Sequence, residues 1–96
     1  MRRFKFHPAA RKELREAILF YDERAAGLGR EFLDEVNVTI RRICDMPAAW
    51  PKLTEGVRRC AMHRFPYGII YRETNRMIEI VAVMHQHRHP DSWKGR

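Results

Sequence analysis

Two stretches of apolar residues at helical spacing lie on either side of a three-residue break, Gly27-Leu28-Gly29. Steps of three and four residues put these side chains on one stripe of a helix, facing the core. The stripe in the first stretch consists of Ala10, Leu14, Ala17, Ile18, Tyr21 and Ala25, and that in the second of Phe32, Val36, Ile40 and Ile43. Glycine suits the left-handed residue that ends a helix, and Pro47 ends the second stretch. Because the break is so short, the sequence predicts an antiparallel helical hairpin.

The segments that flank the hairpin differ in character. Arg3–His7 alternates between aromatic and basic side chains, which predicts a short half-buried strand. Pro8 follows, and proline fits the first turn of a helix because its missing N–H would have no partner there. After the hairpin, Pro47–Gly56 contains two prolines and a glycine and has no apolar period. This stretch is expected to be a loop.

Three further strands are expected after that loop, over Val57–Phe65, Ile69–Arg72 and Met77–His85. Between the last two, Glu73–Arg76 has the composition of a hairpin turn in which Asn75 accepts a positive φ. The last strand is the most apolar and is expected to be central in the sheet, buried on both faces. The fold class that follows is α+β in the order β-α-α-β-β-β. In it an antiparallel helical hairpin packs on a small, mainly antiparallel sheet, in a single domain over residues 1–96.

The charge of the chain is basic and uneven. There are 19 Lys and Arg against 12 Asp and Glu, a formal net charge of +7. Residues 1–48 hold 10 basic and 8 acidic side chains, whereas residues 49–96 hold 9 and 4. A basic face implies an anionic partner, which can be nucleic acid, an acidic protein or an anionic membrane surface. The alternative is a solvated surface that needs no partner.

The sequence contains neither a membrane segment nor a secretory signal. The longest apolar run, Ile80–Met84, is the size of a strand, and no apolar stretch follows the basic residues near the N-terminus. Cys44 and Cys60 are too few for a disulfide scaffold and are expected to fill space in the core as free thiols. The expected localisation is therefore the cytoplasm.

Candidate metal ligands are limited to His85-x-His87-x-His89, which on an extended strand project to the same side. No carboxylate or thiol stands beside them to complete a site. The sequence also lacks a glycine-rich phosphate loop, a serine nucleophile motif and cysteine pairs at zinc spacing. We therefore expect no metal and no cofactor, and interpret these histidines as a solvated strand end.

Basic and aromatic residues are interleaved in the second half of the chain, and two interpretations of them stay open. Arginines grip phosphates and aromatic rings stack on bases, so such a surface can hold RNA. With a histidine as acid or base and Glu55 nearby, it can also activate a 2′-hydroxyl for cleavage. Alternatively, the arginines lie on the solvated side of a sheet and pair with Glu73, Glu79 or a protein partner. The residues in question are Arg58, Arg59, Arg64, Tyr67, Tyr71, Arg72, His85, His87, Arg88, Trp93 and Lys94.

Several short motifs follow one another along the chain. The first half contains Phe4-x-Phe6-His7-Pro8-Ala9-Ala10, then Glu13-Leu14 with Ala17 and Tyr21, and then Leu28-Gly29-x-x-Phe32. The second half contains Pro47-x-x-Trp50-Pro51, Arg58-Arg59, Arg64-Phe65-Pro66-Tyr67, Ile70-Tyr71-Arg72 and Ala82-Val83-x-His85-x-x-Arg88-x-Pro90-x-x-Trp93. In this order and spacing, from about Phe4 to Trp93, the motifs resemble the RelE/ParE superfamily of toxins from bacterial type II toxin–antitoxin modules, on the ParE (plasmid-stabilisation) side. The fold of that superfamily agrees with the expected order of elements.

The resemblance implies a growth-inhibiting toxin that a small cognate antitoxin neutralises. The antitoxin would be of the ribbon-helix-helix type, with a disordered, acidic C-terminal segment that wraps around the toxin in a hetero-oligomer. ParE-type members act on DNA gyrase and are not known as enzymes. For antitoxin binding, strand edges and exposed members of the hairpin are implied: Tyr21, Leu28 and Phe32. For target binding, the C-terminal portion is implied: His87, Arg88, Trp93, Lys94 and Arg96. The alternative for Trp93 is that it only holds the tail on the sheet.

RelE-type members instead cut mRNA on the ribosome, and that activity is the alternative. Its site would use Glu55, Arg64 and His85, placed by their positions relative to the expected strands. Two features favour the gyrase interpretation, in which no residue is catalytic. Lysine is missing from the three late strands, and Gly68 stands where one cleaving subgroup has an arginine. A third possibility is a non-toxic member that only binds its antitoxin.

Overall fold

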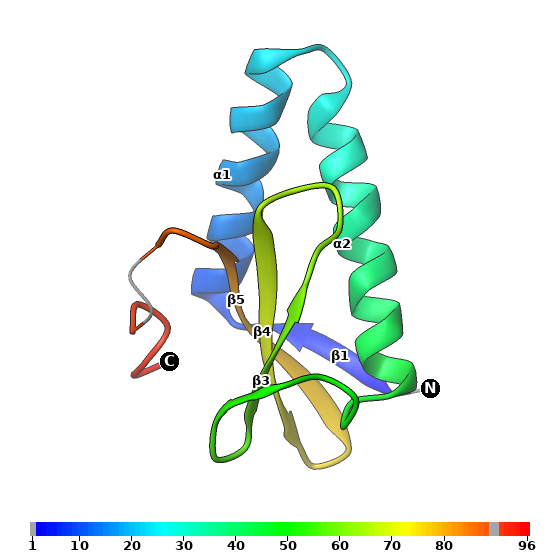
Figure 1. Ribbon diagram of the computed structural model, residues 1–96, viewed down its shortest axis with the longest axis vertical. Coiled ribbons are helices and arrows are strands. Elements are labelled where there is room, and N and C mark those ends of the chain that lie inside the picture. Colours follow the sequence, from blue (N-terminus) through cyan, green and yellow to red (C-terminus); the bar gives the residue numbers. More distant parts are fainter. Residues whose placement is uncertain (1, 89–90) are drawn as a thin grey trace.

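Helices and strands follow the apolar periods of the sequence in a computed structural model that describes residues 2–88 and 91–96. In chain order they are β1 (Arg3–Phe6), α1 (Pro8–Arg24), α2 (Leu28–Asp45), β2 (Lys52–Thr54), β3 (Val57–Ala61), β4 (Tyr67–Thr74) and β5 (Met77–His85). The strands form one sheet in the order β1-β5-β4-β3-β2, with β1 parallel to β5 and the other pairs antiparallel. The two helices lie side by side on one face of this sheet (Figure 1). The predicted α+β class is confirmed.

His7 and Pro8 determine where α1 begins. His7 caps the helix, because its Nδ1 accepts a hydrogen bond from the Ala9 N–H at 3.1 Å. Pro8 occupies the first turn, as predicted.

The turn of the hairpin uses its two glycines differently. Gly27 has a φ of +87°, a conformation that side chains with a Cβ rarely adopt. Gly29 already belongs to α2 and allows close packing, because a Cβ there would lie 2.5 Å from the carbonyl oxygen of Ile18 on α1. The Oδ1 of Asp22 accepts hydrogen bonds from the N–H groups of both glycines. The predicted hairpin therefore depends on a contact between the helices as well as on a turn.

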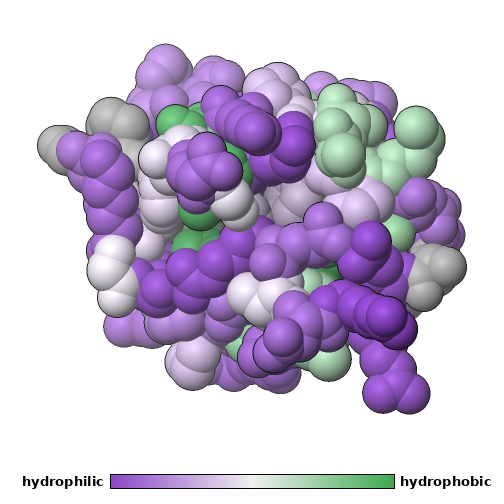
Figure 2. Space-filling view, turned by 90° about the horizontal axis from the view of Figure 1, so that it is seen from below, coloured by the Kyte–Doolittle hydropathy of each residue, from purple (hydrophilic) through white to green (hydrophobic). Residues whose placement is uncertain are grey.

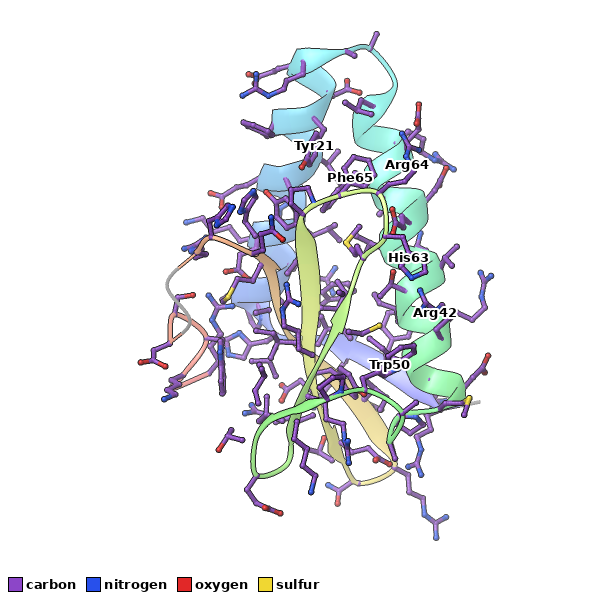
Figure 3. The ribbon with its side chains drawn as sticks, viewed as in Figure 1. Tyr21, Arg42, Trp50, His63, Arg64 and Phe65 are labelled. Carbon is purple, nitrogen blue, oxygen red and sulfur yellow. The ribbon has the colours of Figure 1, made fainter. Side chains whose placement is uncertain are left out.

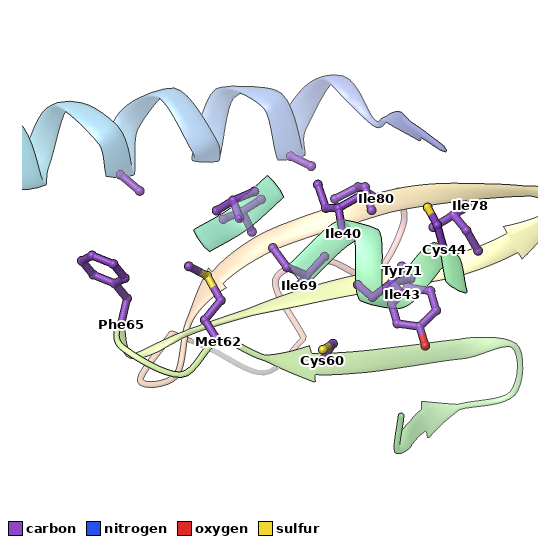
Figure 4. Packing of buried hydrophobic residues seen from close by; sticks show 14 of the residues in the cluster. Ile40, Ile43, Cys44, Cys60, Met62, Phe65, Ile69, Tyr71, Ile78 and Ile80 are labelled. Atoms are coloured by element: carbon purple, nitrogen blue, oxygen red, sulfur yellow. The ribbon is translucent and has the colours of Figure 1, made fainter. Parts of the chain in front are cut away.

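The main core lies between the hairpin and the sheet. The predicted stripe of α2 is fully buried there, and α1 contributes Ala10 and Ala17. The sheet supplies its alternating apolar residues, several of which Figure 4 shows facing the helices. These sheet residues are Cys60, Ile69, Tyr71, Ile78, Ile80 and Val83. Both cysteines are buried free thiols, as expected.

A second, smaller apolar cluster covers the opposite face of the sheet. It contains Val57, Ile70, Val81, Ala82, Met84 and Trp93. The register between β4 and β5 shifts after Ile70, so that Val81 is an extra residue opposite β4. This bulge explains why Val81 and Ala82, although adjacent in the sequence, belong to the same cluster.

The sheet differs from expectation in three places. Lys52–Thr54 forms β2 inside the stretch predicted as a loop. The sequence does not predict this strand because its three residues are all exposed and pair only with β3, so they show no apolar alternation. β3 ends at Ala61 rather than Phe65, because the chain leaves the sheet and Phe65 turns into the core. β4, at Tyr67–Thr74, is longer than predicted and takes the middle position, because β1 pairs on the far side of β5. The turn after β4 has positive φ at both Asn75 and Arg76.

The surface is mainly polar where the β4–β5 turn lies. Seen from this end, small hydrophobic areas stand among hydrophilic side chains (Figure 2). Neither α1 nor α2 has the length and apolar character that crossing a membrane requires, within the part of the chain that the structure describes.

Candidate functional site

The three residues of the ribonuclease alternative do not meet. Glu55 lies in the turn between β2 and β3, beside Val57, which pairs with Arg72 on β4. His85 ends β5 and pairs with Tyr67 at the other end of β4. Five residue steps along β4, from Tyr67 to Arg72, separate these two levels, which corresponds to roughly 17 Å at the rise of an antiparallel strand. Glu55 and His85 therefore lie toward opposite ends of the sheet.

Arg64, the third of these residues, lies in the loop between β3 and β4 and faces α2. Its guanidinium contacts Glu31 on α2 at 2.7 Å. The carboxylate of Glu35, one turn further along α2, accepts hydrogen bonds from the backbone N–H groups of His63 and Arg64. Figure 3 shows this loop against the helix. These contacts fix the loop to α2 and pair the guanidinium of Arg64 with a carboxylate of that helix.

The ring of His85 packs beside two other rings, and His85 lines a hollow together with Glu13 and Arg88. Its ring lies edge-on to that of Tyr67, with centroids 5.2 Å apart, and 5.3 Å from the ring of His87. The backbone N–H of His87 donates to the Nδ1 of His85 at 3.0 Å, which leaves Nε2 as the protonated nitrogen of the neutral ring. His89, the third histidine of the expected triplet, lies outside the described residues. Among the described residues no cluster of three potential ligands can hold a metal.

The C-terminal tail (residues 86–88 and 91–96) is anchored by two of the residues expected to bind the target. Trp93 is 8% exposed and packs in the second apolar cluster. Arg96 donates two hydrogen bonds to the carboxylate of Glu13 on α1, at 2.8 and 2.9 Å, and a third to the carbonyl oxygen of Val81. The side chains of Glu13 and Arg96 are only 7% and 14% exposed. Trp93 and Arg96 therefore hold the tail in place, and neither is free to face a partner.

Further hydrogen bonds support this anchor. The carboxylate of Glu13 also accepts a hydrogen bond from the Val83 N–H at 3.1 Å, and this bond joins α1 to β5. Arg72 donates to the carbonyl oxygen of Arg96 and to Glu79, at 2.8 and 2.7 Å. The hydrogen bonds that Arg96 donates to Glu13 raise the pKa of Arg96 above its ordinary value.

Three of the tail residues expected to face the target are exposed. His87 is exposed, Arg88 is half-exposed and approaches Glu13 at 3.8 Å, and Lys94 contacts Asp91 at 2.9 Å. Arg88 also lines a hollow of about 250 Å³ beside Trp93. Across this hollow lies Arg59, whose guanidinium lies against Gly68, where a Cβ would be 2.4 Å from its Cζ.

Among the described residues, those that line this hollow include no carboxylate. Arg59 and Arg88 thus line the same hollow. In the sequence, only the missing side chain at Gly68 indicates this hollow. Gly68 was interpreted there as a departure from the arginine of one cleaving subgroup.

Of the three hairpin residues that were expected to be exposed for antitoxin binding, one is buried. Phe32 is 0% exposed, so its expected exposure is wrong. It lies on the inner stripe of α2 and stacks on Tyr21 with centroids 5.2 Å apart. Tyr21 and Leu28 are partly buried against the core, and burial raises the pKa of the Tyr21 hydroxyl. Among the described residues, the large apolar side chains of the hairpin that are exposed are Leu19, Phe20 and Val38, which lie outside the predicted stripes, and Ala25 at the end of the first stripe is exposed too.

Comparison with known proteins decides the family. The model of the family described as "ParE toxin of type II toxin-antitoxin system, parDE" matches residues 4–90. The chain belongs to the ParE toxin family. It is 29% identical over 92 residues to Toxin ParE2 of Mycobacterium tuberculosis, in strains CDC 1551 / Oshkosh and H37Rv; the match covers 95% of this chain and 88% of the relative.

The fold also has a counterpart among solved structures. A chain of the chromosomal ParDE system from P. aeruginosa superposes with a TM-score of 0.65 at 18% identity, over 88% of this chain and 96% of that one. ParE toxins pair with an antitoxin in a ParDE module. The resemblance stated from the sequence motifs is thereby confirmed.

Proposed function

We propose that this ParE-family chain inhibits bacterial growth by acting on DNA gyrase in the cytoplasm, and that a cognate antitoxin neutralises it. The antitoxin is of the ribbon-helix-helix type, with a disordered, acidic C-terminal segment. In this function the toxin binds its target without catalysing a reaction. His87, Arg88 and Lys94 carry the contact with the target.

The observation that carries the choice of gyrase over mRNA is the separation of Glu55, Arg64 and His85. Acid–base cleavage requires the base within hydrogen-bond reach of the 2′-hydroxyl and the acid within reach of the leaving 5′-oxygen of the same phosphodiester. Roughly 17 Å between the levels of Glu55 and His85 is too far for one phosphodiester, and Arg64 contacts α2 instead. A binding function has no such requirement, since exposed cations on the tail suffice for contact.

The charge of the chain supports the antitoxin. A net charge of +7 attracts an acidic, disordered segment, which steers the encounter and offsets part of the ordering entropy on binding. This electrostatic attraction acts on any acidic partner.

The proposal is tested by inducing the toxin in bacteria and following DNA and protein synthesis separately. An inhibitor of gyrase stops incorporation of thymidine before that of methionine, whereas cleavage of mRNA on the ribosome reverses the order. We expect thymidine incorporation to fall first and co-expressed antitoxin to restore growth. Methionine incorporation that falls first, and is restored in Glu55→Ala or His85→Ala, would establish the ribonuclease instead. Normal growth of cells that express the toxin without antitoxin, together with intact binding of the antitoxin by the purified chain, would identify a non-toxic member.

A further inference from the structure

The guanidinium of Arg59 on β3 has no partner for its charge within residues 2–88 and 91–96, where it makes neither a salt bridge nor a side-chain hydrogen bond. Its neighbour Arg58 donates to the carbonyl oxygen of Trp50 at 2.7 Å. Arg72 on β4 donates to Glu79 at 2.7 Å. Arg59 is nevertheless half-buried. A cation that gives up part of its hydration without gaining a partner in the chain favours an anion from another molecule.

Gly68 on β4 determines where this guanidinium lies. Arg59 pairs with Ile70 between β3 and β4, so both side chains point to the face of the sheet that carries the second apolar cluster. The side chain of Arg59 runs diagonally from there to Gly68, where a Cβ would lie 2.4 Å from its Cζ. The guanidinium therefore occupies the space that a side chain at residue 68 would fill.

Arg59 shares a hollow of about 250 Å³ with Arg88, and we call it the arginine hollow. Within the described part of the chain, none of the residues that line it is a carboxylate. Leu53 is 44% exposed and the side chain of Arg88 is 51% exposed, so the rim of the hollow is open to solvent. The apolar lining comes from Leu53, Ile70, Met84 and Trp93.

The chemistry of the arginine hollow fits a phosphodiester of a polymer. Guanidinium groups bind phosphate oxygens through paired N–H groups, and the two non-bridging oxygens of a diester offer an acceptor to each arginine. The apolar lining can accommodate the adjoining sugar. Pockets that enclose a free small ligand usually measure about 300–1,000 Å³. A smaller hollow with an open rim fits one unit of a chain that continues beyond it.

The position of Arg88 decides which polymer that is. Arg88 lines the arginine hollow and also belongs to the tail surface that we propose to contact gyrase. A target bound at the tail therefore lies beside Arg59 as well. Gyrase acts on duplex DNA, so the proposed function brings the backbone of that DNA to the hollow.

We propose that Arg59 and Arg88 bind a backbone phosphate of duplex DNA in the arginine hollow. The toxin would then contact the DNA of the gyrase complex in addition to the enzyme. This proposal rests on the proposed function and adds a second contact to it. Because phosphate contacts carry no information on the bases, the binding is independent of DNA sequence.

The test measures binding of the full chain to a labelled duplex of about 20 base pairs by fluorescence anisotropy at several salt concentrations. Arg59→Gln removes one cation and leaves no carboxylate without its partner. The matched control is Arg15→Gln, which removes one exposed cation from α1. We expect Arg59→Gln to bind about fivefold or more weakly and to lower the slope of log affinity against log salt by about 1. The control should keep the slope and bind within about twofold of the natural chain.

Gly68→Ala is a second variant, and it leaves the charge unchanged. The atoms that its Cβ would meet belong to the flexible end of Arg59, so the guanidinium moves away while the backbone stays in place. We expect this variant to lose about threefold or more in affinity for the duplex. Its circular dichroism spectrum should match that of the natural chain.

Equal losses of affinity in Arg59→Gln and Arg15→Gln, or an unchanged salt slope in Arg59→Gln, would overturn the phosphate site. Tighter binding of a single-stranded RNA or of a glutamate-rich peptide than of the duplex would overturn DNA as the occupant. The measurement needs no gyrase, so the two proposals fail separately. DNA binding that depends on Arg59, with gyrase unaffected by the toxin, would overturn the proposed function and leave the phosphate site. Inhibition of gyrase by a toxin that does not bind the duplex would overturn the phosphate site alone.

Discussion

At the scale of single residues, one buried ion pair connects the two ends of the chain. Glu13 on α1 and Arg96 in the tail lie 83 residues apart in the sequence, and their charged groups are joined by two hydrogen bonds. Removing one partner leaves the other charge buried without compensation, which costs far more than breaking an exposed pair. The position of the tail therefore depends on a carboxylate near the start of the chain.

Glu13→Gln should lower the free energy of unfolding by about 2–4 kcal/mol, because Arg96 keeps its charge and its burial. Urea unfolding followed by circular dichroism measures the change. The control Asp34→Asn removes an exposed i,i+4 pair with Arg30 and should cost less than about 0.5 kcal/mol. A Glu13→Gln variant as stable as the control would show that the pair does not hold the tail.

Tyr71 makes stability depend on pH in the alkaline range. Burial raises the pKa of its hydroxyl from 10.0 to about 12, and that hydroxyl donates to the carbonyl oxygen of Pro47 at 2.5 Å. The folded state holds this proton more tightly than the unfolded state, so the contribution is complete below pH 10 and is lost as the pH rises from 10 to 12.

Between those pH values the natural chain should lose up to about 2–3 kcal/mol more stability than Tyr71→Phe, which has no proton to release. The measurement is urea unfolding at a series of pH values, comparing the slopes of the two proteins rather than their absolute stabilities. Parallel slopes would mean that the hydroxyl of Tyr71 ionises with an ordinary pKa.

At the scale of elements, the hairpin is held by the contact of α2 with α1 at Gly29. The atom that a side chain would meet is a backbone oxygen, that of Ile18, which cannot turn away as a side chain can. Gly27 differs, because the space around it is open and only its positive φ opposes substitution.

Gly29→Ala should therefore lower the free energy of unfolding by about 2–3 kcal/mol, since the helices must separate. The control Gly27→Ala should cost about 1 kcal/mol from backbone strain alone. Chemical denaturation of the two variants compares them directly. A smaller loss in Gly29→Ala than in Gly27→Ala would contradict the close approach of the helices.

The elements also show how far the sequence determines the structure. The stripe of α2 and the apolar run of β5 were predictable, because burial repeats over many residues in each. β2 was not, because three exposed residues carry no period. For the site, exposure of His87, Arg88 and Lys94 followed from their polarity. The anchoring of Arg96 by Glu13 and the hollow that Arg59 and Arg88 share depend on tertiary contacts that no local pattern records.

At the scale of the whole molecule, basic charge is placed at two separate surfaces. One is the hollow between β1 and α2, lined by Arg3, Lys5 and Arg41, and the other is the tail, with Arg88 and Lys94. They belong to different elements: β1 and α2 line the first surface, and the segment after β5 carries the second.

The target surface is tested with Arg88→Gln/Lys94→Gln, which removes two exposed charges without placing a negative charge beside Glu13. We expect inhibition of gyrase to need about tenfold more of this variant than of the natural chain. The control Lys12→Gln/Arg15→Gln should inhibit as the natural chain does. Equal inhibition by both variants would place the contact with gyrase elsewhere.

The most direct measurement is a supercoiling assay with purified gyrase, relaxed plasmid and the purified toxin. The proposed function predicts that supercoiling is inhibited, that cleaved plasmid accumulates, and that prior addition of antitoxin prevents both effects. Full gyrase activity in the presence of the toxin, together with cleavage of mRNA on translating ribosomes that His85→Ala abolishes, would contradict it.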